Sequence, residues 1–526
     1  MRLTPFAKLF IAAVVVAVVG FTGWHYYSRG AFNPPKTAAT PDLAGVAKAD
    51  DKDKPPVDES GVGKPKAKQP RNPKKIIVGV NDFGGAYPGI VANDGATPGP
   101  NSRFSRAGLD VEIRLIRGSK ERLQAFDDGE VDVMLLTLDY FANLVPIYAK
   151  KGDKLQAFFM ADWSRGNLGI VSKPTIKSIE ALRDAKVATT RNTPTHYFLL
   201  SLLKKSNLKA EEIEKVKSSI VFATKTPQAG EMFKRGEVDA VAIWEPHLSQ
   251  AMGGDKGRLL VSTTTATNMI ADVLFARQSF LTSHEEELTT FVRIWLEGVK
   301  MLDENPKPGV ELIARTFKQS VEETGALLGK IKPATFADNR AFFGLDREQC
   351  AYVTLFDDAA RFWQKEGVID TVPQAAPHRW LKPLEANQKD HADEKVAEKF
   401  VFRAPKPGVD PLLTKSVSIY FASGDATLGP NARQIVDQFQ ETLAQFGNAY
   451  IRVEGNTDNV GARAANQTLS KKRAQALVDY LVEKHGLDKR RIQAVGNGPD
   501  KPVGDNKTEG GRELNRRTDF AIIPND

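Results

Sequence analysis

Polar side chains that could bind a small ligand follow three apolar runs of the sequence. Asp82 follows "KKIIVGVN", Thr137 and Asp139 stand at the end of "GEVDVMLLTLD", and Glu245 ends "GEVDAVAIWE". Each run is too short for a helix and is unbroken in its apolar character, which is typical of a buried strand in a parallel α/β sheet. Ligands of open α/β sheets bind at the carboxyl ends of strands. These side chains are therefore candidate ligand contacts, and the three carboxylates suit a cationic or hydroxylated part of a ligand.

A second chemistry is indicated by "TTRNTPTHYFLLSLLKK". Thr193 is expected to cap a helix whose first turn contains Pro194, Thr195 and His196. Free backbone N–H groups and two hydroxyls would then form an anion site, with simple helix capping by Thr193 as the alternative. Four aromatic residues are candidates for stacking on the ligand or, alternatively, for filling a hinge: Phe83, Tyr87, Trp163 and Trp244.

The elements that must position these residues occur twice. The tetrapeptide GEVD starts at Gly129 and again at Gly236, each time after an amphipathic run and before an apolar one. This order predicts helix, glycine-containing turn and buried strand in each of two α/β lobes, with a ligand cleft between them. Coincidence of four residues is the alternative.

Composition limits the classes of function. The chain of 526 residues has room for three or four domains, and part of its net charge of +8 comes from one lysine-rich stretch, so no nucleic-acid partner is predicted. A single cysteine, Cys350, excludes an internal disulfide, and no Cys/His cluster has metal-ligand spacing. Without a nucleophile–base–acid set or a nucleotide-binding glycine loop, we predict a binding protein that has no cofactor and is not an enzyme; a reactive Cys350 is the alternative.

The N-terminus predicts a membrane anchor. Residues 1–8 form a basic cytoplasmic tail, and residues 9–27, "LFIAAVVVAVVGFTGWHYY", have the length of a transmembrane helix. A cleaved signal peptide is the alternative, but no clear cleavage site follows. Residues 28–74 are rich in Pro, Lys, Ala and Asp, which predicts a disordered linker. The anchor contains no carboxylate, which argues against a proton-conducting, flagellar-stator-like role.

Residues 75–385 resemble the type 2 periplasmic substrate-binding proteins of ABC importers, in the branch that takes up nitrate, sulfonates, taurine and thiamine-precursor pyrimidines. The resemblance is carried by "VGVNDFGGAYPG", "NLGIVSK", "ATTRNTPTHYFLL", "ADVLFARQSFL" and both GEVD segments, the second followed by Trp-Glu-Pro. It implies a bilobal α/β fold. One departure is "VANDGATPGPNSRFSRAG", which contains too much Pro and Gly to be helical throughout and weakens any contact carried over from the first helix, Tyr87 included.

After a linker at residues 386–409, residues 410–526 resemble the OmpA-like peptidoglycan-binding domain, an α+β fold. "GNTDNVGARAANQTLSKKRAQALVDYL" and "RIQAVGNGPDKPVGDNKTEGGRELNRRTDF" carry this resemblance. It implies that Asp458 takes the ammonium of diaminopimelate and Arg473 its carboxylate; a structural ion pair between them is the alternative. Asn456 replaces the histidine commonly found before Thr-Asp. Neighbouring positions that would shape the pocket are Thr457, Asn466, Leu469 and Arg516.

Together these features predict a single-pass inner-membrane protein with periplasmic domains, which binds a small oxyanion-bearing molecule and is held to peptidoglycan. An ABC permease is a further expected partner. The alternative is a structural envelope anchor whose binding-protein-like domain docks a protein partner.

Overall fold

The computed structural model describes residues 74–525, apart from 83, 254–255, 346, 348–349, 398–399, 406–408, 420 and 422–423. The predicted anchor at residues 9–27, nearly all of the predicted linker at 28–74, and Phe83 lie outside the described residues. Within the part of the chain that is described, no helix combines the length and the apolar character that crossing a membrane requires.

Lobe 1 of the binding-protein-like domain is built on a six-stranded sheet. β1, β2 and β3 run parallel, as their apolar sequences predict, whereas β10 runs antiparallel between β3 and β4. The sheet is therefore mixed, because the chain leaves it after β4 and re-enters it as β10 from the opposite direction. Its order is β11 (Ile331–Pro333), β4 (Leu155–Ser164), β10 (Ala271–Arg277), β3 (Val133–Thr137), β1 (Lys75–Val80) and β2 (Asp110–Leu115).

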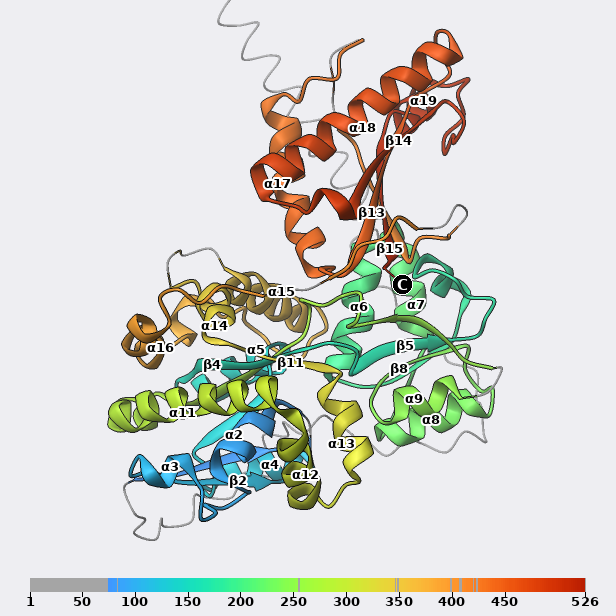
Figure 1. The fold of residues 1–526 in the computed structure, drawn as a ribbon. Helices are drawn as coiled ribbons and strands as arrows, with labels where there is room; N and C mark the ends of the chain where they lie inside the picture. Colours follow the sequence, from blue (N-terminus) through green and yellow to red (C-terminus); the bar gives the residue numbers. More distant parts are fainter. Residues whose placement is uncertain are drawn as a thin grey trace, which may run out of the picture. The chain divides into compact units, whose positions relative to one another are not determined.

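Helices cover this sheet, with α11 (Glu285–Glu304) packed along α2 (Tyr87–Asn93) and α15 (Ala351–Lys365) along α5 (Leu138–Lys150) (Figure 1). The first helix ends early, as predicted, because Asp94 adopts a left-handed conformation with φ of 56°. The other helices of lobe 1 are α3 (Arg103–Arg106), α4 (Ser119–Asp127), α10 (Gln278–Ser283), α12 (Pro306–Phe317), α13 (Val321–Leu328), α14 (Phe336–Phe343) and α16 (Lys382–Asn387).

Lobe 2 is an insertion between β4 and β10 with its own five-stranded sheet. Both GEVD copies follow a helix, α4 in lobe 1 and α8 in lobe 2, and their glycines turn the chain with φ of 68° at Gly129 and 78° at Gly236. The copies lead into β3 and β8, which confirms the predicted helix, turn and strand in each lobe. The strand order is β7 (Ile220–Ala223), β6 (Val187–Thr190), β8 (Ala240–Trp244), β5 (Leu168–Ser172) and β9 (Arg258–Ser262); the helices are α6 (Pro194–Lys205), α7 (Ala210–Ser219), α8 (Thr226–Lys234) and α9 (His247–Met252).

Two chain segments, residues 164–168 and 262–271, connect the lobes. Thr263 joins these segments: its hydroxyl accepts a hydrogen bond from the Gly166 N–H at 2.8 Å and shares another with the Ser164 hydroxyl at 2.8 Å. The Thr263 N–H also donates to the Leu168 carbonyl at 3.0 Å. The crossing segments thus form one short hydrogen-bonded hinge.

The C-terminal domain has a four-stranded sheet with α17 (Pro430–Gln445) and α18 (Arg463–His485) on one face and the short α19 (Glu509–Asn515) (Figure 1). Two glycines let α18 approach the sheet closely: a Cβ on Gly455 would lie 2.2 Å from the Ser470 carbonyl oxygen, and one on Gly496 would lie 2.5 Å from the Lys471 nitrogen. The strand order is β12 (Leu413–Val417), β15 (Thr518–Pro524), β13 (Ala449–Asn456) and β14 (Ile492–Gly498).

Candidate functional sites

The candidate contacts of lobe 1 lie where β3 ends. The antiparallel strand β10 begins there, next to the end of β4. Asp272 at the start of β10 pairs with Thr137 on one side and with Asp162 of β4 on the other. Asp139 follows in the first turn of α5. Three carboxyl groups therefore gather at one edge of the sheet, of which the sequence predicted only that of Asp139.

These carboxyl groups are buried and lie close to other polar groups. Asp139 is 4% exposed and is approached by the Thr137 side chain and by the backbone of Asp139 and Tyr140, and Asp162 and Asp272 share a side-chain hydrogen bond. Burial raises the pKa of Asp139 to about 7 and that of Asp272 to about 6. The pKa of Asp162 is also raised well above its usual value, first by burial and then by the charge of Asp272. Asp162 and Asp272 could have been suspected from the sequence, because each is an acidic residue inside an otherwise apolar strand.

The other lobe 1 residues predicted to contact a ligand are Asp82, Tyr87 and Trp163, and they differ in burial and partners. Asp82 is held in an ion pair by Arg117, whose Nε donates to Oδ2 at 2.9 Å. Tyr87 is fully buried and its hydroxyl has no partner. Trp163 packs edge-on against Phe342 with ring centroids 5.4 Å apart, next to the hinge, which fits the hinge-filling alternative for this residue.

The lobe 2 side contains the predicted helix start. Thr193 caps α6, because its hydroxyl accepts from the His196 N–H at 3.5 Å, and it donates to the Thr190 carbonyl at 2.7 Å. Thr195 is 1% exposed and shares hydrogen bonds with the hydroxyls of Thr193 at 2.9 Å and Thr189 at 3.1 Å. The hydroxyls predicted to receive an anion are thus connected to one another and to the backbone.

His196 is neutral at physiological pH. Burial, followed by the charges of Arg191 and Lys217, lowers its pKa to about 4, and its Nδ1 accepts a hydrogen bond from the Asn192 N–H at 3.3 Å. The positive charge at this helix start comes instead from Arg191, which is exposed and lies over the ring of Phe222 at 3.8 Å. Sequence reasoning missed Arg191, although it stands two residues before Thr193.

Glu245 lies beside the hinge, where its N–H donates to the Asn167 carbonyl at 2.9 Å. Its side chain is 2% exposed and forms an ion pair with Lys330, which precedes β11 of lobe 1. Its carboxylate also accepts from the N–H and hydroxyl of Ser249 at 3.1 and 2.8 Å. Trp244 is half-buried beside it. Glu245 therefore connects the two lobes in this structure, and Lys330 could not be recognised as its partner from the sequence.

Trp363 of α15 lies between the helix starts of the two lobes. Its indole N–H donates to the Asp139 carbonyl at 2.8 Å, and its ring lies 6.1 Å from the ring of His196 and 6.2 Å from that of Tyr197. One buried side chain thus contacts the first turn of α5 in lobe 1 and the first turn of α6 in lobe 2.

In the C-terminal domain, the predicted clamp lies beyond the carboxyl end of β13. Asp458 is 9% exposed; its Oδ1 accepts from the Val460 N–H at 3.0 Å and its Oδ2 from Arg516 Nη1 at 2.7 Å. Arg516 also contacts Glu509 at 2.9 Å. The ion-pair partner of Asp458 is thus Arg516, a residue predicted only to shape the pocket.

Arg473 reaches the same region from α18. Its Nε donates to the Asp425 carbonyl at 2.9 Å and its guanidinium lies over the ring of Phe421 at 4.9 Å. Burial lowers its pKa, and the negative charges of Asp425 and Asp458 oppose that shift. Asp458 and Arg473 are therefore close enough to interact electrostatically.

The neighbouring predicted residues shape the loop of Asp458. Asn466 Nδ2 donates to the Val460 carbonyl at 2.9 Å and to the Asp458 carbonyl at 3.4 Å. The Thr457 N–H donates to the Gly498 carbonyl at 2.9 Å. Leu469 is half-buried one turn before Arg473 on α18.

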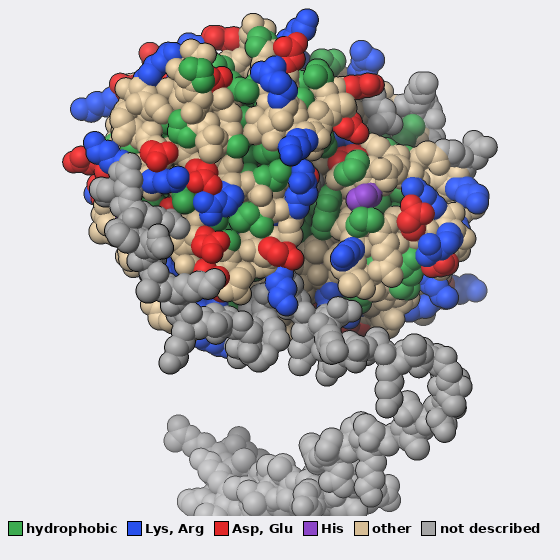
Figure 2. All heavy atoms as spheres, turned by 90° about the horizontal axis from the view of Figure 1, so that it is seen from below, with side chains coloured by type: hydrophobic (Ala, Val, Ile, Leu, Met, Phe, Trp, Pro, Cys, Tyr) green, Lys and Arg blue, Asp and Glu red, His purple; other side chains and the backbone are tan. Residues whose placement is uncertain are grey.

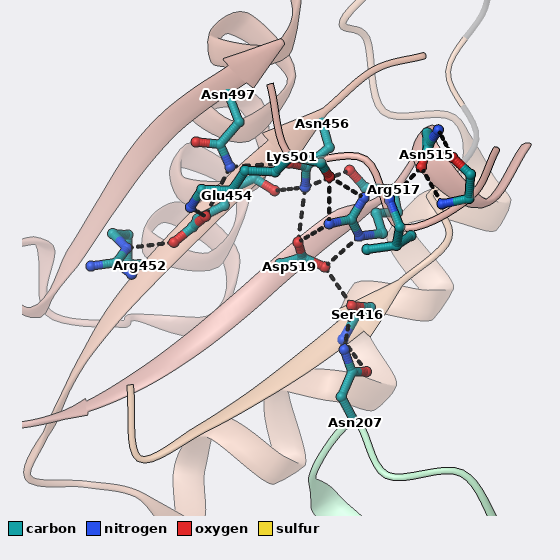
Figure 3. Close-up of polar contacts among 12 residues, drawn as sticks. Asn207, Ser416, Arg452, Glu454, Asn456, Asn497, Lys501, Asn515, Arg517 and Asp519 are labelled. Carbon is teal, nitrogen blue, oxygen red and sulfur yellow. Dashed lines mark hydrogen bonds and ion pairs between the residues drawn. The ribbon is translucent and has the colours of Figure 1, made fainter. Parts of the chain in front are cut away.

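A buried polar network supports this loop from below (Figure 3). Asn456 Nδ2 donates to Asp519 Oδ2 at 2.9 Å, and its Oδ1 accepts from Asn497 Nδ2 at 3.0 Å. Glu454 accepts from Asn497 at 2.8 Å and from Lys501 at 2.5 Å. Asn456 stands where the family usually has a histidine, directly before Thr457 and Asp458 in the sequence. In this network it both donates and accepts hydrogen bonds.

Residues 69–315 match the NMT1-like family and residues 420–516 match the OmpA family. The chain joins an NMT1-like domain to an OmpA-family domain. The OmpA-family domain is 36% identical to Outer membrane protein A of Bordetella avium over 126 residues. The aligned region covers 23% of this chain and 64% of that protein. It is 35% identical over 109 residues to the outer-membrane lipoprotein YfiB of Pseudomonas aeruginosa, over 21% of this chain and 64% of that protein. The chain spans between 31% and 64% of the length of the curated relatives that it matches.

Solved structures similar to the NMT1-like domain include the periplasmic aliphatic sulphonate binding protein SsuA of Escherichia coli, with a TM-score of 0.46, 17% identity, and coverage of 60% of this chain and 100% of that one. A putative periplasmic sulfonate-binding protein SsuA of Methylobacillus flagellatus has a TM-score of 0.47 and 18% identity, over 62% of this chain and 99% of that one.

Proposed function

We propose that the protein is an envelope solute-binding protein whose NMT1-like domain binds a small oxyanion-bearing molecule and whose OmpA-family domain attaches it to peptidoglycan. The observation that carries the proposal is the joining of these two domain types in one chain. It is a binding function, since the sites described above contain acids, bases and hydroxyls in recognition arrangements and present no nucleophile activated by a base.

The anion would be received at the first turn of α6. The helix dipole favours negative charge there, Thr193 and Thr195 provide hydroxyls, and Arg191 provides an exposed positive charge. His196 would contribute as a neutral group, since its pKa is lowered to about 4. Because Thr195 and His196 are almost fully buried, the ligand would enter when lobe 2 moves about the hinge at residues 164–168 and 262–271.

Thermal stability of the full chain with sulfonates, nitrate, phosphonates and carboxylates tests this function. Binding should raise the melting temperature with ligand concentration. Thr195→Asp, which places a like charge in the anion site, should abolish that rise and leave the protein folded. An unchanged rise in the variant would contradict the proposed anion site.

Attachment to the wall would use the zwitterionic centre of diaminopimelate. Asp458 would take the ammonium, and Arg473 would take the carboxylate with the planar donor set that suits it. The burial of Asp458 and the electrostatic interaction between Asp458 and the half-buried Arg473 support this assignment. Sedimentation with purified diaminopimelate-type sacculi, competed by free diaminopimelate, tests it; lysine-type sacculi should retain less protein.

Residues 9–27 would anchor the chain in the inner membrane with the two domains in the periplasm, where an ABC permease would be a further partner. The sequence supports this placement through its basic flank and apolar run. Protease added to spheroplasts should leave only a short N-terminal fragment. Protection of the full-length chain would contradict the orientation.

The structural alternative, in which the NMT1-like domain docks a protein partner, is favoured by one observation. Glu245 is already paired with Lys330 and Ser249, so it would have to exchange partners before it could bind a ligand. Failure of every oxyanion in the thermal assay, together with retained sacculus binding, would support this alternative.

A further inference from the structure

The C-terminal domain is hydrogen-bonded to lobe 2 through its edge strand, β12. The Ser416 N–H donates to Asn207 Oδ1 at 3.0 Å, and Asn207 Nδ2 donates back to Ser416 Oγ at 2.7 Å (Figure 3). Two residues earlier, the Thr414 N–H donates to Glu180 Oε1 at 2.8 Å. The Ser416 hydroxyl also donates to Asp519 of β15. Side chains of lobe 2 thus pair with the backbone edge that a terminal strand of a sheet leaves open.

The same domain is also bonded to the hinge, through one asparagine. Asn268 lies on the crossing segment 262–271, where its N–H donates to the Gln445 carbonyl at 3.1 Å and its Nδ2 to the Ala444 carbonyl at 2.9 Å. Its Oδ1 accepts from Nη2 of Arg165, on the other crossing segment, at 3.3 Å. Asn268 therefore joins both crossing segments to the end of α17.

The turn that follows α17 fits closely against the hinge. Asn448 Nδ2 donates to the Thr264 carbonyl at 3.1 Å. A Cβ on Gly447 would overlap Oγ1 of the buried Thr267 and lie 3.2 Å from Asn268 Nδ2. Gly447 is not in the left-handed region, so glycine is required here by the close approach and not by its backbone conformation. A larger side chain would push the C-terminal domain away from the hinge.

The C-terminal domain is held less firmly against lobe 1. Asp358 of α15 and Glu441 of α17 bring like charges together there: burial, followed by the charge of Asp358, raises the pKa of Glu441. A cavity of about 200 Å³ lies at this junction, and both carboxylates line it together with Lys205 and Lys415. Facing like charges and unfilled volume both weaken a contact. The domain is therefore attached to the lobe that moves and to the hinge more firmly than to the scaffold.

We infer that the docked C-terminal domain restrains the hinge of the binding domain and so regulates the opening of the cleft. The inference rests on the proposed function and adds the regulation of that same site. α6 connects the two regions: Thr195 and His196 of the proposed anion site lie in its first turn, and Ser206 and Asn207, which follow its last turn, bond to β12.

The restraint follows from where the hydrogen bonds are made. The C-terminal domain bonds to the body of lobe 2 at Asn207 and to the crossing segment at Asn268. A swing of lobe 2 about the hinge changes the distance between these two points, so both sets of bonds cannot be kept during the swing. Docking therefore stabilises the arrangement seen here relative to one in which lobe 2 has swung away from lobe 1.

Double electron–electron resonance on the full chain tests this restraint without any ligand, so the result does not depend on which solute binds. Nitroxide labels are placed at exposed sites of lobe 1, lobe 2 and the C-terminal domain by Lys300→Cys, Glu231→Cys and Glu483→Cys, in a Cys350→Ala background. The distance between the labels of lobe 1 and lobe 2 reports the opening of the cleft. The distance between the labels of lobe 2 and the C-terminal domain reports docking.

Gly447→Leu places a side chain where the turn has no room for one, so both distance distributions should become longer and broader. Gly429→Leu is the matched control at the start of α17, where a Cβ meets nothing within 4 Å, and should change neither distribution. Asn207→Arg disrupts the contact with β12 from the lobe 2 side and should act as Gly447→Leu does. A folding defect in one variant therefore leaves the other to decide.

Two results would overturn the inference. A docking distance that stays at the wild-type value in Gly447→Leu and Asn207→Arg would show that the domain is not docked in this way. A lost docking distance with an unchanged distance between the lobes would show that docking does not hold the hinge. Either result leaves the proposed function standing, because that function fails only if no oxyanion raises the melting temperature of the full chain.

Discussion

Asp458 Oδ2 accepts a hydrogen bond from Arg516 Nη1 at 2.7 Å, so the acid of the predicted clamp has an arginine partner from the segment that follows α19. Arg473, the predicted basic half, approaches from α18 and interacts with Asp458 through its charge. The acid thus contacts one guanidinium group directly and interacts with a second through its charge. In the proposed complex it could keep Arg516 while it takes the ammonium of the stem peptide.

Asp458→Ala, Arg473→Ala and Arg516→Ala should each reduce binding to diaminopimelate-type sacculi. The first two should remove most of it, because truncating one member of a buried charged set costs about 2–5 kcal/mol in binding. The Asp458→Ala/Arg473→Ala double variant should be little worse than either single one. Arg463→Ala, which breaks an ion pair with Asp500 at an arginine that is 76% exposed, is the control. Sedimentation measures all five variants; wild-type binding by both Asp458→Ala and Arg473→Ala would refute the clamp.

The close contact between α18 and its sheet makes Gly455 and Gly496 intolerant of any side chain. Gly455→Ala would force its methyl group to 2.2 Å from a carbonyl oxygen, and Gly496→Ala to 2.5 Å from a backbone nitrogen. Because backbone atoms cannot move aside as a flexible side chain can, each should destabilise by about 1–3 kcal/mol or more in urea unfolding. At Gly510 on α19 a Cβ meets nothing within 4 Å, so Gly510→Ala should be neutral or slightly stabilising. Equal effects at all three sites would contradict the packing explanation.

The ion pair of Glu245 and Lys330 should matter more than a surface pair. Lys330→Met leaves a carboxylate that is 2% exposed without its cation. Because Lys330 itself is 30% exposed, we expect a loss below the ~3–5 kcal/mol of a fully buried pair. Lys330→Met/Glu245→Gln should recover much of this loss. Lys300→Met, whose pair with Glu304 is exposed on both sides, should change the free energy of unfolding by less than about 0.5 kcal/mol. A Lys330→Met variant as stable as Lys300→Met would show that the pair contributes nothing.

His196 should make stability fall as the solution becomes acidic. Its folded pKa of about 4 is below the unfolded value of 6.5, so the unfolded chain binds the extra proton first. Its contribution is therefore complete above pH 6.5 and is lost as the pH falls towards 4, by an amount of order 3 kcal/mol. His196→Gln should have a shallower decline in unfolding free energy between pH 6.5 and 4.5 than the wild type. Parallel curves would mean that His196 is not buried in its neutral form.

The sequence predicted those parts of the fold that repeat a local pattern. Both GEVD segments became helix, turn and strand, and the early end of the first helix followed from its glycines and prolines. It did not predict the antiparallel β10, because an apolar strand has the same composition in either direction. Lys330 and Arg516 were missed as ion-pair partners because each lies more than fifty residues from its acid, and only the assembled fold brings them together.

Figure 2 shows how charged side chains are distributed over one face of the molecule. Lys and Arg side chains are interspersed with Asp and Glu across this face, without a continuous basic stripe. The excess of +8 in the whole chain is therefore not concentrated on the surface drawn there.

The position of lobe 2 as an insertion has a mechanical consequence. The described chain enters lobe 1 at β1, and it leaves lobe 1 through α16, where Asn387 Nδ2 donates to the Thr289 carbonyl of α11 at 3.1 Å. If the two ends are anchored in membrane and wall, a pulling force between those anchors passes along the chain through lobe 1. Lobe 2 shares this load, because it is also bonded to the C-terminal domain: the Ser416 N–H donates to Asn207 Oδ1 at 3.0 Å, and the Ile179 N–H donates to the Leu412 carbonyl at 2.9 Å. Turgor and envelope stretch would therefore strain these contacts of lobe 2 as well as the scaffold of lobe 1.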